Sequence, residues 1–417
     1  MDKNETNGSR PRILAMGFSM EEIVLRVGNQ RWTAFSWLLE LEHAEAVRFD
    51  VSAGTSSEMD GEEPCTGTLL RDYHASIVMP SREPHRLSAN DLAETLPNFV
   101  VGSISAGRDH IQPPADRPDI KVFSCDSGDC NASEVAEFTV AVAVCLLRRL
   151  LEASQHAVGR LGANSGFSNT PFRQTESLDR KRWLALGTGR QIQFLIPRLA
   201  AGGVRELVIF SPRKSPPNRS DFDKLFSKIP ELCCSVTSET DALFHRDVTL
   251  VAGAPMTVSM IYGDRPLGLA LERADITSLH LPYVQEESPT YIRTADWLNH
   301  SLLSNIRADA ILVNVARGGI VVESDLVHLL RERKIGGYAT DVVSSESSVF
   351  RDGTNIPGLS PILDEAMNRI AAAACPGLMI TPHIAGTSVQ AFERISSTVV
   401  DRMLKALQPR RSKGGEI

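Results

Sequence analysis

Arg317 and His383 are the side chains whose places in the sequence point most directly to chemistry. Arg317 follows an apolar, β-branched run at 311–315 and is itself followed by two glycines. Such a run is typical of a buried parallel strand, and open α/β sheets bind ligands at the carboxyl ends of their strands. A guanidinium at that edge favours a ligand with an anionic or carbonyl group, because its planar donors match paired oxygens.

Two carboxylates and the histidine accompany later strands of the same expected sheet. Asp341 and Glu346 lie in and after the strand expected at 338–343, and His383 follows the strand expected at 378–380. We expect all three beside Arg317, because parallel strands end at one edge. There a histidine held by a carboxylate can exchange a proton, and an arginine can bind and polarise a carbonyl acid. Taken singly, each residue is also compatible with a surface or loop position that has no chemical role.

A nucleotide-binding turn is expected at Gly187 and Gly189, after the apolar strand at 183–186. In such turns the first glycine makes the tight turn and the second lets the backbone approach a pyrophosphate. The pyrophosphate would lie at a helix N-terminus, on the amides of Arg190, Gln191 and Ile192. Ile192 stands where a third glycine is usual, and Pro197 falls inside the expected helix, where it can kink the chain. Such turns also occur without a ligand, so the prediction depends on the strand–turn–helix–strand context.

The end of the next strand, expected at 204–210, bears on the type of nicotinamide cofactor. An acidic residue there would bind the ribose 2′-hydroxyl of NAD, whereas this chain has Ser211, Arg213 and Lys214. The small serine leaves space and the two cations can pair with a 2′-phosphate, so NADP(H) is favoured over NAD(H). The alternative is a solvated basic loop without a ligand.

Composition sets the broad class of the protein. The 417 residues are enough for two domains, and the net charge of −7 argues against a nucleic-acid partner. The most apolar segment, 138–147, is shorter than the about 20 residues that cross a bilayer, so no membrane segment is expected. Residues 1–10 lack the apolar core of a secretion signal. Seven cysteines without a CxxC pair indicate the reduced thiols of a cytoplasmic protein, with neither a disulfide framework nor a metal site.

Strand and helix patterns alternate along the chain. In the first part they indicate strands at 11–16, 76–79 and 99–103 and helices at 32–42 and 133–151. In the second part strands are expected at 183–186, 204–210, 248–252, 276–280, 311–315, 338–343 and 378–380. A last helix, at 388–407, would return to the first domain. This alternation predicts an α/β fold with doubly wound parallel sheets.

Several of these segments together resemble a known family, the D-isomer-specific 2-hydroxyacid dehydrogenases. The matching segments are 105–110, 131–137, 278–282, 313–319, 341–346 and 381–386. The resemblance implies two Rossmann-like doubly wound parallel-sheet domains with a cleft between them. Residues 1–150 plus 385–417 would form the substrate domain. Residues 151–384 would form the dinucleotide-binding domain, with insertions near 213–266 and 350–376.

The resemblance also implies an activity, the reversible reduction of a 2-oxo acid to a D-2-hydroxy acid by a homodimer. The implied catalytic residues are Arg317, Glu346 and His383. The implied substrate-binding groups are the amides of Ala106 and Gly107, together with Arg317. The implied cofactor-binding set adds His280, Pro282, Val315, Ala316 and Asp341. Because Ile192, Pro197 and Ser347 depart from the family pattern, the alternative is a weakly active or inactive nucleotide-binding or interaction protein on the same scaffold.

Overall fold

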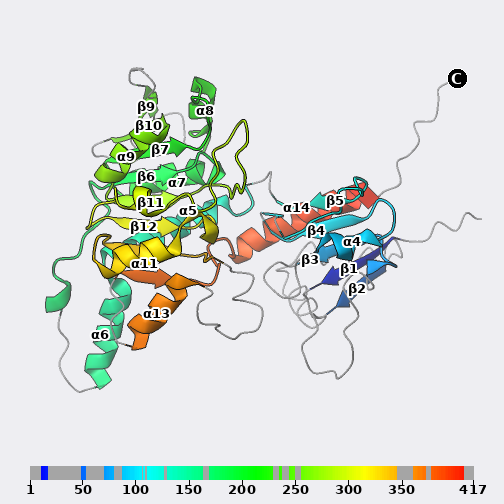
Figure 1. Ribbon diagram of the computed structural model, residues 1–417, viewed down its shortest axis with the longest axis horizontal. Coiled ribbons are helices and arrows are strands. Elements are labelled where there is room, and N and C mark those ends of the chain that lie inside the picture. The colour runs from blue at the N-terminus through cyan, green and yellow to red at the C-terminus, as the bar shows by residue number, and fades with distance from the viewer. Residues whose placement is uncertain are drawn as a thin grey trace, which may run out of the picture. The chain divides into compact units, whose positions relative to one another are not determined.

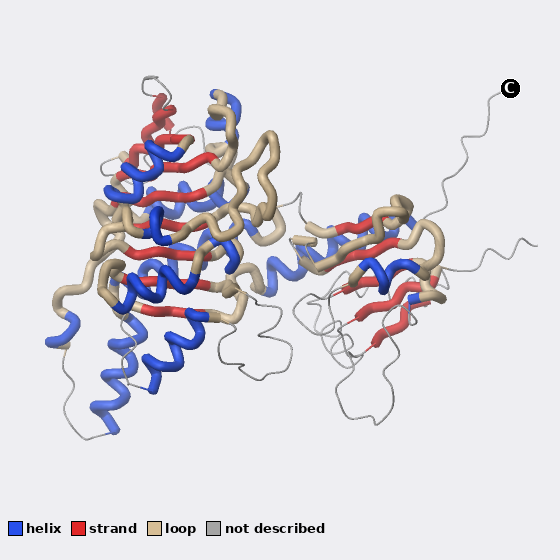
Figure 2. The backbone as a smooth tube through the Cα atoms, in the orientation of Figure 1, coloured by secondary structure: helices blue, strands red, loops and turns tan. Residues whose placement is uncertain are grey.

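The structure is a computed structural model. It describes residues 11–16, 48–52, 70–78, 87–105, 107–108, 110–125, 129–162, 169–228, 234–236, 244–248, 255–344, 360–371 and 377–407. The chain forms two compact units, residues 1–131 with 387–417 and residues 132–386. Each unit has its own largely parallel sheet (Figures 1 and 2). Each unit also has its own hydrophobic cores.

The first unit is built on a five-stranded sheet in the order β2-β1-β3-β4-β5, with every neighbouring pair parallel. Its strands are β1 (Arg12–Met16), β2 (Arg48–Ser52), β3 (Ala75–Val78), β4 (Val100–Ser103) and β5 (Lys121–Phe123). Strands β1, β3 and β4 were predicted from the sequence. The helix predicted at 32–42 lies outside the described residues.

Helix α14 (Val389–Leu407) covers one face of this sheet with Ile395, Val399 and Met403. The short helix α4 (Ala89–Ala93) packs Leu92 into the core on the other face. A Cβ atom at Gly102 would lie 2.0 Å from Sδ of Met403, so the glycine is what allows the close packing of α14 on β4. The two ends of the sequence therefore share one core.

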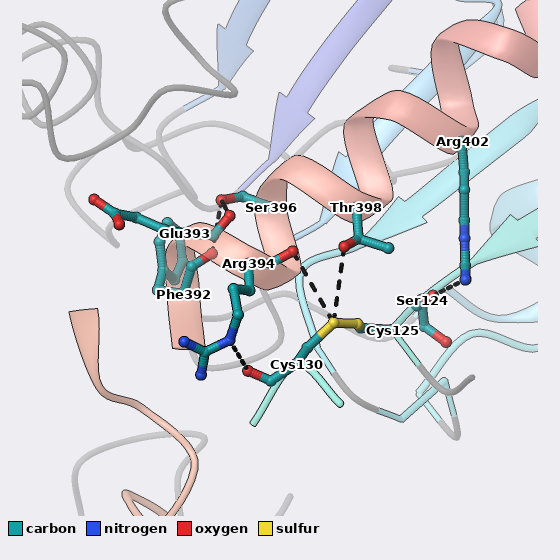
Figure 3. Close-up of a disulfide and its surroundings, with 9 residues drawn as sticks. All are labelled: Ser124, Cys125, Cys130, Phe392, Glu393, Arg394, Ser396, Thr398 and Arg402. Atoms are coloured by element: carbon teal, nitrogen blue, oxygen red, sulfur yellow. Dashed lines mark hydrogen bonds between the residues drawn. A yellow bond between two sulfur atoms is a disulfide. The ribbon is translucent and has the colours of Figure 1, made fainter. Parts of the chain in front are cut away.

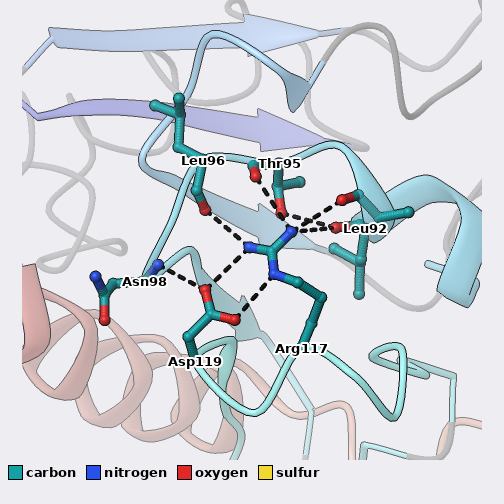
Figure 4. Close-up of polar contacts among 7 residues, drawn as sticks. Leu92, Thr95, Leu96, Asn98, Arg117 and Asp119 are labelled. Atoms are coloured by element: carbon teal, nitrogen blue, oxygen red, sulfur yellow. Dashed lines mark hydrogen bonds and ion pairs between the residues drawn. The ribbon is translucent and has the colours of Figure 1, made fainter.

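Arg117 ties the loop after α4 to the segment before β5 (Figure 4). Its guanidinium donates to the carbonyl oxygens of Leu92, Ala93, Thr95 and Leu96. It also pairs with Asp119 at 2.9 Å, and this hydrogen bond is the main reason why the pKa of Asp119 lies far below its usual range. The arrangement satisfies carbonyls that the end of a helix leaves without donors.

A disulfide joins Cys125 and Cys130, so the expectation of reduced thiols is wrong for these two cysteines, whereas Cys145 is free (Figure 3). The residues are five positions apart and their Cα atoms are 6.3 Å apart, a separation that a disulfide can span. Helix α14 holds the bridged segment at both ends. Arg394 Nε donates to the carbonyl of Cys130 at 3.0 Å, and Arg402 donates to the carbonyl of Ser124 at 2.8 Å.

The second unit is built on a nine-stranded sheet in the order β14-β13-β12-β11-β6-β7-β10-β9-β8. Its strands are β6 (Arg182–Leu186), β7 (Glu206–Ser211), β8 (Cys234–Val236), β9 (Phe244–Val248), β10 (Met256–Tyr262), β11 (Ile276–Leu279), β12 (Ile311–Asn314), β13 (Gly337–Thr340) and β14 (Leu378–Ile380). Neighbours from β14 to β10 are parallel, and β9 and β8 form an antiparallel edge. The strand order reverses between β6 and β11, the point where doubly wound sheets bind ligands.

Helices cover both faces of the second sheet. Helices α5 (Ala132–Leu147) and α7 (Arg190–Ala201) bury apolar side chains in the core on one face. Helices α9 (Asp264–Arg273), α10 (His300–Leu303), α11 (Glu323–Arg331) and α13 (Pro361–Ala371) contribute to the core on the other. Because both faces are covered, the central strands can be apolar throughout, as the runs at 184–186 and 311–313 are.

The predicted helix at 133–151 is two helices, and both belong to the second unit. Helix α5 ends at Leu147, Arg149 takes a left-handed conformation with φ of 51°, and α6 (Leu150–Gly162) follows. Val135, Ala136, Val142 and Ala143 of α5 pack in the same core as α7, and this packing assigns α5 to residues 132–386. The predicted boundary near residue 150 therefore differs from the boundary in the structure.

The segment predicted as an insertion, 213–266, contains a strand of the parallel sheet. Strand β10 pairs with β7 over six residues, Thr257 to Tyr262. Of the strand predicted at 248–252 the structure describes Val248, which is the last residue of β9. Strand β9 is antiparallel to β10, whereas the sequence predicted a parallel strand here. Residues 249–254 lie outside the described part. Of the second expected insertion, 350–376, the structure describes α13.

Candidate active site

The turn after β6 has the shape expected of a nucleotide-binding turn. Gly187 has φ of 127°, and a Cβ atom there would lie 2.3 Å from the carbonyl oxygen of His280, so only glycine fits. Gly189 is the N-cap of α7, and nothing lies within 4 Å of the position of its Cβ. The first glycine is thus required by packing, while the second borders open space.

Ile192 is accommodated in the core instead of weakening the turn. Its side chain is fully buried among residues of α5 and the sheet. Its amide, however, donates to the carbonyl of Gly189 at 3.1 Å, which argues against the predicted contact of this amide with a pyrophosphate. Helix α7 continues to Ala201 with Pro197 inside it, so the proline does not end the helix.

The turn fits a dinucleotide by two criteria. The first backbone amides of a helix have no acceptor within the helix, and an anion can take their hydrogen bonds. The open space beside Gly189 lets such an anion approach the backbone. Arg190 and Gln191, the first two residues of α7, are the residues that would hold it.

The side chains at the end of β7 that were predicted to bind the cofactor already contact other residues of the protein. Ser211 is buried, with its hydroxyl oxygen 3.4 Å from the amide of Arg213. Arg213 pairs with Asp221 at 3.0 Å, and Lys214 pairs with Glu287 at 3.3 Å. A cofactor phosphate would have to share or replace these carboxylates.

His280 follows β11 and lies inside the fold. Both ring nitrogens have partners: Nδ1 is 2.7 Å from Oε1 of Gln191, and Nε2 is 3.0 Å from Oγ of Ser278. Burial lowers the pKa of His280 to about 3, so the ring is neutral at physiological pH. Pro282, two residues later, is exposed and its carbonyl accepts a hydrogen bond from Thr294.

Asn314 shapes the turn that presents Arg317. Its buried side chain donates to the carbonyl of Arg317 and accepts from the amide of Ala316, both at 3.0 Å. A Cβ atom at Gly318 would lie 2.0 Å from the backbone of Val343, so the turn lies directly on the segment that follows β13. Arg317 is partly exposed and donates to the carbonyl of Ala316 at 2.9 Å. Val315 and Ala316 are buried beside it.

Asp341 holds the turn that presents His383. Its carboxylate accepts hydrogen bonds from the hydroxyl of Thr381 at 2.6 Å and from the amides of Ile384 and Ala385 at 2.8 Å. The amide of His383 donates to the carbonyls of Asp341 and Thr381, and φ of His383 is 55°. The side chain of His383 is exposed while Asp341 is buried. Asp341 thus positions the histidine through its backbone.

The predicted residues Glu346 and Ala106 lie outside the described residues, and Gly107 lies at the edge of that gap. The structure instead reveals a buried carboxylate that the sequence did not single out. Glu323, at the start of α11, accepts from the amide of Ser344 at 2.6 Å and from the hydroxyl of Ser360 at 2.7 Å. Ser344 and Ser360 are the described residues on either side of the segment that carries Glu346, so Glu323 links the two ends of that segment. Its only sequence signal is an acidic first helical turn, which many helices have.

The carboxyl ends of β6, β11, β12, β13 and β14 thus bring the nucleotide turn, Arg317 and His383 to one edge of one sheet. No group of three or more His, Cys, Asp or Glu side chains in the described ranges could hold a metal ion. Nor does the described part of the chain contain a helix long and apolar enough to cross a membrane.

Comparison with known proteins identifies part of the second unit. Residues 258–385 match the family model of the D-isomer specific 2-hydroxyacid dehydrogenase, NAD binding domain. The (S)-sulfolactate dehydrogenase of Chromohalobacter salexigens is 33% identical over 34% of this chain and 38% of that protein. The glycerate dehydrogenase of Methylorubrum extorquens is 30% identical over 32% of this chain and 35% of that protein. The chain thus aligns with less than half the length of either relative.

The likeness of fold covers more of the chain. A crystal structure of D-lactate dehydrogenase from Aquifex aeolicus, complexed with NAD and lactic acid, has a TM-score of 0.61. It is 18% identical and covers 94% of each chain, a likeness that shows the fold alone. The predicted α/β fold class and the family resemblance are both confirmed. The part of the chain that carries this similarity is residues 258–385, which match the NAD-binding domain of that family.

Proposed function

We propose that the protein reduces a 2-oxo acid to a D-2-hydroxy acid, reversibly, with a nicotinamide cofactor. The observation that carries the proposal is the pair of hydrogen-bonded turns at the ends of β12 and β14. One turn presents Arg317 and is shaped by Asn314, and the other presents His383 and is held by Asp341. A protein that only bound a nucleotide would need neither a cation nor a histidine held in this way.

The chemistry divides between the cofactor and the side chains. A bound reduced nicotinamide supplies the hydride that adds to C2 of the 2-oxo acid. As the carbonyl π bond breaks, His383 donates a proton to the oxygen and a hydroxyl group forms. Arg317 binds the carboxylate and the carbonyl oxygen and stabilises the negative charge that develops there. Glu346 is proposed to hold His383 protonated, and in the oxidative direction His383 accepts the proton.

NADP(H) is proposed as the preferred cofactor, with NAD(H) as the alternative. Support comes from the end of β7, where Ser211 replaces an acid and Arg213 and Lys214 supply cations. The ion pairs with Asp221 and Glu287 oppose this preference, because each carboxylate competes with a phosphate.

The double variant Arg213→Ala/Lys214→Ala tests the cofactor preference. It should weaken NADPH binding by about tenfold or more, because hydrogen bonds to charged groups are lost, and leave NADH binding nearly unchanged. The measurement is the dissociation constant of each cofactor, obtained from nicotinamide fluorescence. The matched control is Arg219→Ala, which removes a partly exposed cation that pairs with Asp223 within helix α8 (Arg219–Lys224). Equal losses for the two cofactors in the double variant would remove the argument from the 2′-phosphate.

A homodimer and a cytoplasmic location are further parts of the proposal, and both rest on the resemblance to the family. The Cys125–Cys130 disulfide opposes the cytoplasmic location, because stable disulfides are rare in the cytosol. Light scattering of the purified protein measures its oligomeric state. The mass of the protein alkylated in cells, without reduction, measures the redox state of the two cysteines.

The activity is tested by turnover. Purified protein is mixed with NADPH or NADH and a panel of 2-oxo acids, with side chains from hydrogen to aryl groups, and oxidation of the cofactor is followed by absorbance. The proposal expects turnover with at least one acid and a product of D configuration by chiral chromatography. Cofactor binding without turnover of any acid would favour the alternative, an inactive nucleotide-binding protein on this scaffold.

A further inference from the structure

A chain of buried side chains runs from the centre of the second sheet to the nucleotide turn. Trp183 of β6 donates its indole N–H to Oγ of Ser278 in β11 at 2.7 Å. Ser278 lies 3.0 Å from Nε2 of His280, and Nδ1 of His280 lies 2.7 Å from Oε1 of Gln191 in α7. Trp183, Ser278 and His280 are 1%, 0% and 7% exposed, so water does not compete for the hydrogen bonds among these three side chains.

The donors and acceptors of this chain are consistent with one arrangement of protons. Oε1 of Gln191 can only accept, so Nδ1 of His280 carries the proton. Nε2 of a neutral imidazole then has none and accepts from the hydroxyl of Ser278, which in turn accepts from Trp183. Burial keeps the ring neutral, as its lowered pKa indicates. Every polar atom of this chain as far as Oε1 of Gln191 is therefore satisfied.

The arrangement fixes the orientation of the Gln191 side chain. Its oxygen is committed to His280, so the amino group, Nε2, is the half that remains for other partners. Within the described residues this amino group has no hydrogen-bond partner. It offers donors only, as do the backbone amides at the start of α7, and donors at this place favour an anion.

The backbone of His280 is joined to the same turn. Its amide donates to the carbonyl of Leu186 at 2.7 Å, and its carbonyl occupies the space that a side chain at residue 187 would need. His280 thus contacts the turn through its main chain and the first turn of α7 through its ring. The ring therefore links the centre of the sheet to Gln191, the second residue of α7.

We propose that His280 is a positioning residue for the cofactor and that Gln191 is the binding residue on which it acts. His280 holds the carboxamide oxygen of Gln191, so that the amino group of Gln191 donates a hydrogen bond to a phosphate oxygen of the dinucleotide. This inference rests on the proposed function, and it replaces a direct contact between the ring of His280 and the cofactor.

A double-mutant cycle tests the proposal in the full-length protein. The variants are Gln191→Leu, His280→Phe and the combination of the two. The probes are NADH and NADPH, whose dissociation constants come from fluorescence titration. Each single variant should weaken binding of both cofactors about tenfold, because a hydrogen bond to a charged group is lost. The double variant should bind no more weakly than Gln191→Leu alone, because His280 acts only through Gln191.

The other outcomes overturn the inference in distinct ways. If Gln191→Leu binds as tightly as the wild type, Gln191 is no ligand. If the two losses multiply in the double variant, His280 acts independently of Gln191. If the wild type itself binds neither cofactor, the proposed function fails and the inference fails with it. Normal wild-type binding together with either of the first two outcomes leaves the proposed function in place.

A second pair of variants keeps the test decisive if His280→Phe does not fold. Ser278→Thr and Ser278→Val add the same bulk at a buried position, but only threonine keeps the hydroxyl that fixes the tautomer of His280. The Ser278→Thr protein should bind the cofactor about as tightly as the wild type does. The Ser278→Val protein should bind it several-fold more weakly. Equal affinities of the two variants would contradict the proposal, and their unfolding midpoints report any general loss of stability.

Discussion

Asp341 is a buried carboxylate that holds the turn of the proposed catalytic histidine. It accepts hydrogen bonds from Thr381, Ile384 and Ala385, which lie on both sides of His383. With φ of 55°, His383 has a backbone conformation that is uncommon for residues other than glycine, and such a conformation persists only where its surroundings determine it. The resemblance implies that Asp341 binds the cofactor, and from its hydrogen bonds we infer a positioning role as well.

Asp341→Asn should therefore lower both stability and activity. The new amide group would place an N–H opposite the N–H of Ala385 or Ile384, leaving a buried donor unsatisfied at a cost of about 1–3 kcal/mol. Urea unfolding gives the loss of stability, and turnover of a 2-oxo acid gives the loss of activity. Asp116→Asn, at an exposed position, is the control. Unchanged stability and turnover in Asp341→Asn would contradict the positioning role.

At the scale of elements, sequence patterns were reliable where local features determine the structure. The apolar run at 311–313 and the glycines near 187 predicted β12 and the nucleotide turn, because burial on both faces of a sheet and a positive φ leave few alternatives. The prediction placed the end of β12 at Val315, whereas the strand ends at Asn314, whose side chain starts the turn.

Strand β10 was missed because its position depends on contacts distant in sequence. Its residues, Met-Thr-Val-Ser-Met-Ile-Tyr, include the polar Thr257 and Ser259 and lie between Pro255 and Pro266, a pattern that favours a loop over a strand. Pairing with β7 on one side and β9 on the other makes them a buried strand. The break at Arg149 was equally hidden, since no glycine or proline marks it. In the candidate site, the hydrogen bonds of Glu323 and the link from His280 to Gln191 depend on tertiary packing and have no sequence pattern.

Two glycines in the turns of the second sheet should respond to substitution in opposite ways. Gly318→Ala should destabilise the fold by about 1–3 kcal/mol, because the new methyl group would overlap the backbone of Val343. Gly189→Asp should keep the stability, since its side chain enters open space and aspartate is a favoured N-cap. Its negative charge should nevertheless abolish cofactor binding. Unfolding curves and cofactor titrations of both variants measure these effects. Retained binding by a folded Gly189→Asp protein would refute the nucleotide site at this turn.

At the scale of the whole molecule, each unit has its own cores, so each should respond to its own stabilising interaction. A cofactor that binds the turn after β6 stabilises residues 132–386, by about 2.7 kcal/mol at a concentration one hundred times its dissociation constant. Reduction of Cys125–Cys130 removes a constraint from the other unit alone. Calorimetry should therefore show one transition that shifts with cofactor and another that shifts with reductant. A cofactor that shifted only the transition sensitive to reductant would contradict this assignment.

The central claim is that His383 transfers the proton while a separate turn binds the cofactor. The most direct test compares wild-type protein with His383→Ala, measuring the rate of 2-oxo acid reduction and the cofactor dissociation constant in the same preparations. The account predicts that the variant loses at least about a hundredfold in turnover, the usual contribution of a general acid, and binds the cofactor as the wild type does. Turnover by His383→Ala at the wild-type rate would contradict the account.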